Sequence, residues 1–160
     1  MTALMNAINN ENVSLVGQLI RQGTDVNMLE ANGDAPLVMA AYKGNPDIVR
    51  MLLQAGADVA AVDPGMKATA LHAAAYAGNA DAAKLLIQYH IDIDKQGPLN
   101  GYTALHDAIW QGHLETAKLL IDSGANLSLQ SLHGETPLAF ARLKHRSAIA
   151  ALIERKLASK

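Results

Sequence analysis

The clearest pattern of apolar and polar positions lies in the stretch GYTALHDAIWQGHLETAKLLIDSGANL. Leu105, Ala108 and Ile109 recur there at intervals of three and four residues, which places them on one face of a helix. Thr103 stands at the N-cap position, where its hydroxyl can accept hydrogen bonds from the free N–H groups of the first turn. Gly112 ends this predicted helix, because glycine adopts the left-handed conformation without a Cβ penalty.

A second helix is predicted directly after the first. It begins near Leu114 and ends at Gly124, which again suits a left-handed residue at a helix end. Its inward-facing residues are Ala117, Leu119, Leu120 and Ile121. Two short helices cannot bury their apolar faces alone, so neighbouring copies of the unit must cover them.

The same pattern recurs along the chain at intervals of 33 or 34 residues. The leucines equivalent to Leu105 are Leu4, Leu37, Leu71 and Leu138. Glycines equivalent to Gly112 and Gly124 are Gly44 and Gly78, and Gly23 and Gly56. A related motif opens four of the first helices: it reads TALH at residues 69–72 and 103–106, APLV at 35–38 and TPLA at 136–139.

With this period and this motif, the sequence resembles the ankyrin-repeat proteins, whose repeat of about 33 residues carries the signature T-P-L-H-x-A. The resemblance implies an all-α fold, an α-solenoid of helix–turn–helix units joined by β-hairpin-like loops. Residues 1–160 would form a single ankyrin-repeat domain. Its repeats would cover residues 4–31 (an N-terminal cap), 32–63, 64–97, 98–130 and 131–156 (a C-terminal cap).

The resemblance also implies roles for three histidines. His72 and His106 would hydrogen-bond the backbone of a neighbouring loop, and His113 would help to close the turn between two helices. The third repeat departs from the pattern, because Lys67 and His90 stand where other repeats have glycine. Residues other than glycine enter the left-handed region less readily, so we expect local strain there.

Composition restricts the possible partners. No apolar run approaches the roughly 18 residues of a membrane span, so no membrane partner is predicted. The net charge of −2 argues against nonspecific nucleic-acid binding. The chain enters its first repeat without the charged and apolar segments of a secretory signal, which predicts a cytoplasmic location. A chain from which a signal had been trimmed would look the same.

The charges are unevenly distributed. Residues 1–63 carry three basic and seven acidic side chains, whereas residues 142–160 carry six basic and one acidic. Polar outer faces on terminal repeats would account for this and would favour a monomer. Alternatively, the basic end could steer an acidic partner.

The sequence contains no motif for enzyme chemistry. It has no phosphate loop, no G-x-G-x-x-G, no nucleophile elbow and no cysteine. None of its six histidines pairs with a histidine or carboxylate at the spacing that a zinc-binding helix requires. We therefore predict no catalytic residue, no cofactor and no metal site, and a protein that is not an enzyme.

An aromatic residue recurs on the exposed side of three consecutive first helices. Trp110 lies five residues after Leu105, so at 100° per residue it points about 140° away from the core-facing leucine. Tyr42 and Tyr76 occupy the equivalent positions. With helices about 8–10 Å apart, the three rings should span roughly 20 Å of surface. We expect Tyr102 and Asp107 to point outward beside Trp110.

In ankyrin-repeat proteins this side, made of the first helices and the hairpin tips, is the concave surface that commonly binds partners. The predicted partner-binding residues are Met39, Tyr42, Lys43, Met66, Tyr76, Asn100, Tyr102, Asp107, Trp110, Gln111, His133 and Glu135, with Asn32, Asp34 and Lys144 also on the rim. Tyrosine and tryptophan are enriched at binding hot spots. Alternatively, the rings pack against neighbouring repeats and stiffen the solenoid.

The sequence thus favours a non-enzymatic protein–protein interaction module that binds a protein partner through its concave face. Two alternatives remain open: a structural protein that protects or regulates an enzyme, and a secreted host-directed effector. A repeat scaffold can carry many specificities on its variable surface residues, so the fold does not name the partner.

Overall fold

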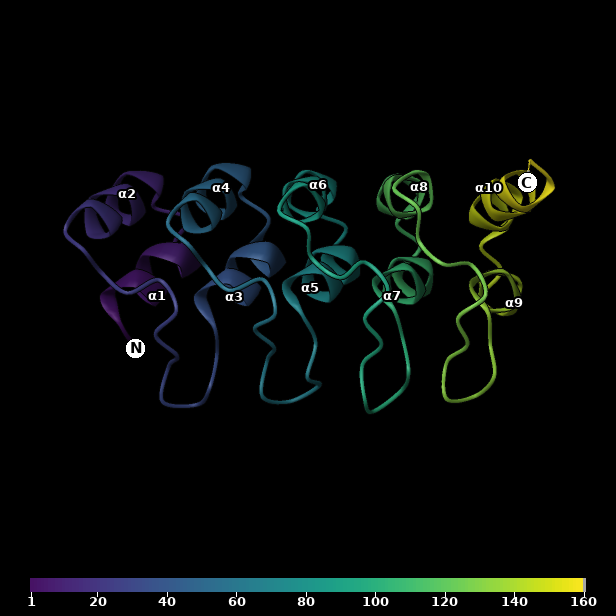
Figure 1. The fold of residues 1–160 in the computed structure, drawn as a ribbon, viewed down its shortest axis with the longest axis horizontal. Helices are drawn as coiled ribbons and strands as arrows, with labels where there is room; N and C mark the ends of the chain where they lie inside the picture. The colour runs from purple at the N-terminus through teal and green to yellow at the C-terminus, as the bar shows by residue number, and fades with distance from the viewer. Residues whose placement is uncertain (160) are drawn as a thin grey trace.

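The computed structural model describes residues 1–159, and this part of the chain is all-helical, as predicted. It contains ten helices that follow one another in five pairs (Figure 1). They are α1 (Ala3–Asn9), α2 (Val13–Arg21), α3 (Pro36–Lys43), α4 (Pro46–Gln54), α5 (Ala70–Ala77), α6 (Ala80–Gln88), α7 (Ala104–Gln111), α8 (Leu114–Asp122), α9 (Pro137–Leu143) and α10 (Ser147–Ala158).

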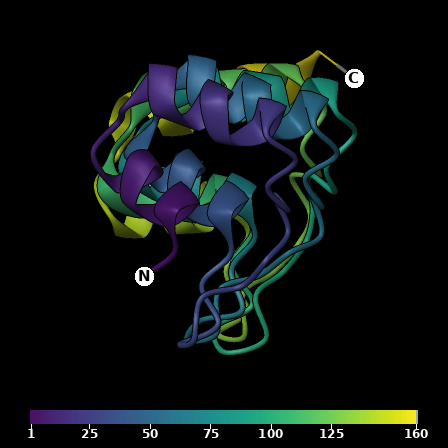
Figure 2. The ribbon, with the colours of Figure 1, turned by 90° about the vertical axis from the view of Figure 1, so that its left-hand side faces the viewer.

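The pairs stack side by side into an elongated molecule with two helical layers. The first helix of each pair lies in one layer and the second helix in the other, and long loops extend from the layer of first helices (Figure 1). Viewed along the stack, these loops project together on one side of the molecule (Figure 2). Helix α1 begins one residue before the first predicted repeat, and α10 ends two residues after the last. Lys160, the end of the predicted domain, lies outside the described residues.

The core lies between the two layers and consists mainly of leucine, isoleucine and alanine. Leu105, Ala108 and Ile109 are at most 1% exposed, and Leu120 of α8, in the second layer, belongs to the same buried cluster. The small alanine side chains allow the short helices to approach one another closely. Within residues 1–159, no helix combines the length and the apolar character that a membrane span requires.

Threonine and histidine together fix the start of the central first helices. In α7, the hydroxyl of Thr103 accepts a hydrogen bond from the N–H of His106 at 3.3 Å, and the His106 Nδ1 accepts one from the N–H of Thr103 at 3.2 Å. Because Nδ1 is an acceptor, Nε2 carries the proton and donates to the Glu135 carbonyl at 2.9 Å. His72 in α5 donates to the Tyr102 carbonyl in the same way, at 2.9 Å. The predicted structural role of both histidines is confirmed.

Left-handed residues occur at helix ends and in the hairpin loops, at the positions where glycine recurs in the sequence. Gly112 has a φ of 75°, and the substituted positions adopt the same conformation: φ is 57° at Lys67 and 64° at His90. Glu11 and His145 occupy the equivalents of Gly112 in the first and last repeats and have φ values of 51° and 57°. The predicted local strain is therefore present at non-glycine residues in three repeats, rather than in the third alone.

Each of the long loops returns on itself and is closed by a backbone hydrogen bond. The N–H of Glu30 donates to the Asp34 carbonyl at 2.9 Å, and Gly97 donates to Tyr102 at the same distance. Between residues 1 and 159 no strand forms, and the isolated bridge Val62–Thr69 is the only β-type pairing there. The loops are thus hairpin-like turns that hold their tips beside the first helices.

Candidate functional site

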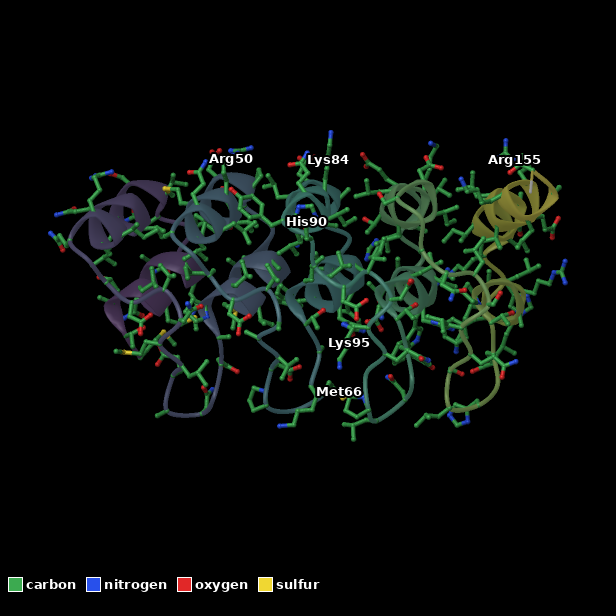
Figure 3. All side chains as sticks on the ribbon, viewed as in Figure 1. Arg50, Met66, Lys84, His90, Lys95 and Arg155 are labelled. Carbon is green, nitrogen blue, oxygen red and sulfur yellow. The ribbon has the colours of Figure 1, made fainter. Side chains whose placement is uncertain are left out.

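A groove of about 670 Å³ runs along the layer of first helices, bounded by α3, α5 and α7 on one side and by the hairpin loops on the other. Its lining is mainly apolar. Eight of the twelve predicted partner-binding residues line this groove: Met39, Tyr42, Lys43, Met66, Tyr76, Asn100, Asp107 and Trp110. Met66 reaches it from a hairpin loop (Figure 3).

Three aromatic side chains from successive repeats form one wall of the groove. Tyr42, Tyr76 and Trp110 lie in the last turns of α3, α5 and α7, and they are 51%, 43% and 41% exposed. The rings of Tyr76 and Trp110 meet edge to face with centroids 6.3 Å apart, which is closer than the helix spacing predicts. These two rings therefore contact each other and still present a large apolar surface to solvent.

Tyr102 does not point freely outward, and in this respect the prediction is wrong. Its ring stacks on His106 at a centroid distance of 5.5 Å, contacts Phe140 at 5.1 Å and meets Trp110 edge to face at 5.7 Å. The side chain is half-buried, and burial raises the pKa of the Tyr102 phenol, with a further contribution from the charges of Glu135 and Asp107. Phe140 belongs to the next repeat, so helix geometry within one repeat could not predict this packing.

Asp107 also differs from the prediction, because it is buried. The residue is only 9% exposed, yet it lines the groove. Helix α7 packs between α5 and α9, and these neighbours cover a side chain that would be exposed on an isolated helix. Burial raises the pKa of the Asp107 carboxyl from its ordinary value of 3.8 to about 7.

The remaining predicted residues lie outside the groove. Gln111 is exposed at the end of α7, and His133 is exposed on the last hairpin loop. Glu135 is half-buried, and its carboxylate accepts a hydrogen bond from the Ser131 hydroxyl at 2.8 Å. The part of these three residues in binding stays a prediction.

The groove also includes residues that were not predicted from the sequence. Asn9 lines it at the position equivalent to Tyr42, 33 residues earlier, so the repeat alignment carried the signal. Asp63 also lines it, and its carboxylate accepts hydrogen bonds from the N–H groups of Met66 at 2.9 Å and Ala68 at 2.7 Å. Asp63 thereby holds the loop that presents Met66, a role that nothing in the linear pattern indicates.

Comparison with known families is decisive for the fold family. A family model described as ankyrin repeats (three copies) matches residues 1–63 and 60–131. The chain belongs to the ankyrin-repeat family. Ankyrin repeats are generally protein–protein interaction modules and generally carry no enzyme activity.

A curated ankyrin-containing relative, the probable E3 ubiquitin-protein ligase XBOS31 of Oryza sativa subsp. japonica, is 35% identical over 71 residues, which is 44% of this chain and 16% of the relative. The match therefore covers a small part of that protein.

In this ankyrin-repeat chain, each aromatic wall residue is tied to the next repeat through its backbone. The carbonyls of Tyr42, Tyr76 and Trp110 accept hydrogen bonds from equivalent positions in the following repeats. The donors are Asn79 Nδ2 at 2.8 Å, His113 Nε2 at 3.0 Å and Arg146 Nη2 at 2.8 Å. His113 thus links two repeats from the turn between α7 and α8, the turn that the resemblance implied it helps to close.

Proposed function

We propose that this protein binds a protein partner in the groove formed by α3, α5, α7 and the adjoining hairpin loops. The observation that carries this proposal is the aromatic wall, because Tyr42, Tyr76 and Trp110 present large apolar side chains to solvent from three successive repeats. Contiguous apolar surface of this kind on a soluble protein marks an interaction site. Aromatic side chains bury a large area on binding and lose little conformational entropy.

The architecture supports the same assignment. The backbone carbonyls of Tyr42, Tyr76 and Trp110 accept hydrogen bonds from side chains of following repeats. The aromatic wall is therefore held in place before a partner binds. A preorganised surface loses less entropy on association than a flexible one. Met66 and Met39 contribute flexible, polarisable side chains that can adapt to a partner.

A pair of double variants tests the proposal. Tyr76→Ala combined with Trp110→Ala removes most of the aromatic wall, and we expect it to abolish partner capture from the source cell. Arg50→Ala combined with Lys84→Ala is the matched control, because both side chains lie on the layer of second helices, away from the hairpin loops (Figure 3). The control should capture the partner as the wild type does.

Far-ultraviolet circular dichroism and thermal melting separate loss of binding from loss of fold. If the Tyr76/Trp110 double variant unfolds, these two rings are structural. In that case the single variant Tyr42→Ala tests whether the groove binds the partner. Tyr42 is half exposed and forms no aromatic pair within residues 1–159. Capture that is unaffected by both the double variant and Tyr42→Ala would contradict the proposal.

A further inference from the structure

Asp107 is a buried carboxylate without an internal partner. It is only 9% exposed, and it lines the groove. Its carboxylate forms no ion pair within residues 1–159, and its oxygens are open to the groove, since Thr116 Oγ1 is the one fully buried side-chain polar atom in that range without a hydrogen-bond partner. A buried charge is costly unless it is paired, so a cation supplied from outside would be stabilised at this site.

The fold does not require a carboxylate at this position. The equivalent residues in three other repeats are Met39, Ala73 and Phe140, all apolar. The first repeat has Asn6, which is exposed to solvent. Asp107 is therefore the one charged residue among the equivalent positions of the five repeats. An apolar side chain would satisfy the packing, which indicates that the carboxylate serves something other than the core.

The side chains beside Asp107 also favour a cation. Trp110 follows it by one helical turn, and Tyr76 contacts the Trp110 ring. Aromatic faces attract ammonium and guanidinium groups. Lys144 illustrates this, because its ammonium lies 6.0 Å from the centroid of Trp110 and 5.5 Å from that of Phe140. Lys144 forms no ion pair with Asp107, so the carboxylate remains available.

The charge of the whole groove also favours a cationic ligand. Besides Asp107, its charged lining residues are Asp34, Asp63 and Lys43. Above pH 7, where Asp107 is ionised, the lining carries three carboxylates and one ammonium, and the Lys144 ammonium lies against the Trp110 ring. Complementary charge steers encounter and excludes partners of the same sign.

We propose that the groove binds a basic segment of the partner protein, with a lysine or arginine side chain seated against Asp107 beside the rings of Tyr76 and Trp110. This inference rests on the proposed function, since it names the chemistry of the partner for the same groove. The aliphatic part of the basic side chain would lie along the apolar wall while its charged end meets the carboxylate. The Coulombic attraction between the two charges is stronger in this partly desolvated position than on an open surface.

Selection from a random linear peptide library tests the inference, and it does not require that the partner be identified first. The wild-type protein should select peptides that share a lysine or arginine at a fixed position relative to apolar residues. Asp107→Asn keeps the shape of the side chain but removes the charge. Above pH 7, where the carboxylate is ionised, this variant should bind a selected peptide about 10- to 100-fold more weakly.

Two matched controls identify the contact. Asp81→Asn makes the same change at an exposed position on α6 and should leave the affinity unchanged. Replacing the shared basic residue of the peptide by glutamine should weaken binding to the wild type as much as Asp107→Asn does. The same peptide change should have little effect on Asp107→Asn, because the interaction is already lost.

The outcomes distinguish this inference from the proposed function. Selected peptides that lose binding on Tyr76→Ala/Trp110→Ala but share no basic residue, or bind Asp107→Asn equally well, would overturn the inference and leave the groove as the binding surface. A selection that yields no peptide dependent on Tyr76 and Trp110 would count against both.

Discussion

The guanidinium of Arg146 donates a hydrogen bond to the carbonyl of Trp110 at a distance of 2.8 Å. A second bond from Arg146 Nε reaches the Ile109 carbonyl at 3.1 Å. The Trp110 carbonyl lies at the end of α7, where helix carbonyls lack a partner within the helix, whereas the Ile109 carbonyl also accepts a hydrogen bond from the N–H of Gly112 at 3.0 Å. The last repeat thereby fixes the end of the helix that carries both Asp107 and Trp110, so stability and the proposed site are linked.

Arg146→Ala should lower the free energy of unfolding by about 1–2 kcal/mol, because two hydrogen bonds from a charged donor to helix-end carbonyls are lost. Urea unfolding followed by circular dichroism measures the change. Arg155→Ala on the outer side of α10 (Figure 3) is the control and should stay within about 0.5 kcal/mol of the wild type. Equal effects of the two substitutions would show that the inter-repeat bonds contribute nothing specific.

His90→Gly should stabilise the protein by about 1 kcal/mol. His90 has a φ of 64°, a conformation that costs a residue with a Cβ about 1–2 kcal/mol, and its side chain is exposed. Gln88→Gly, two residues earlier and still within α6, should instead destabilise the protein, because glycine is unfavourable inside a helix. A lower melting temperature for His90→Gly would contradict this account of strain in the third repeat.

Asp107 should make the protein less stable as the pH rises from about 4 to 7. Burial raises the pKa of the folded carboxyl from 3.8 to about 7, so in this window the folded state holds a proton that the unfolded state has lost. The contribution of Asp107 to the free energy of unfolding is therefore fully present below pH 3.8 and decreases as the pH rises to 7. The total loss is about 4 kcal/mol at most, from 1.36 kcal/mol for each unit of pKa.

The difference between wild type and Asp107→Asn isolates this effect from the other titrating groups. Chemical unfolding at a series of pH values should show an advantage of the variant that is small near pH 4, grows to pH 7 and then levels off. A difference that does not change with pH would mean that the folded and unfolded carboxyls have the same pKa.

The two capping histidines should stay neutral under mildly acidic conditions. Burial lowers the pKa of both His72 and His106 below the ordinary 6.5, although the hydrogen bonds from Nε2 to backbone carbonyls oppose part of this shift. The unfolded chain then takes up protons near pH 6.5 while the folded chain does not, so stability falls as the pH drops below 6.5. A nuclear magnetic resonance titration of the two imidazoles measures this directly. Midpoints at or above 6.5 would contradict it.

The helices could be predicted from the sequence because their determinants are local. The spacing of Leu105, Ala108 and Ile109, the cap at Thr103 and the stop at Gly112 all act within one repeat, and the structure places each of them as predicted. The repeat period then extended the prediction to the other copies. Family resemblance added the His72 and His106 bonds, which a single repeat could not indicate.

The site was predicted less completely, because it depends on contacts between repeats. Tyr102 turns inward owing to Phe140, which lies 38 residues later, and Asp107 is buried by the helices on both sides of α7. A rotation of 100° per residue gives a direction on one helix, but it cannot say which neighbour covers that direction. Aligning Asn9 with Tyr42 would have extended the predicted groove to the first repeat.

Site-specific photo-crosslinking tests the central claim most directly. A photoreactive phenylalanine derivative placed at Tyr42 would report on the groove, and the same group at Arg50 would report on the layer of second helices. If the groove binds the partner, irradiation in the source cell should link a partner protein to position 42 and not to position 50. Crosslinking at position 50 with none at position 42 would contradict the assignment of the groove as the binding surface.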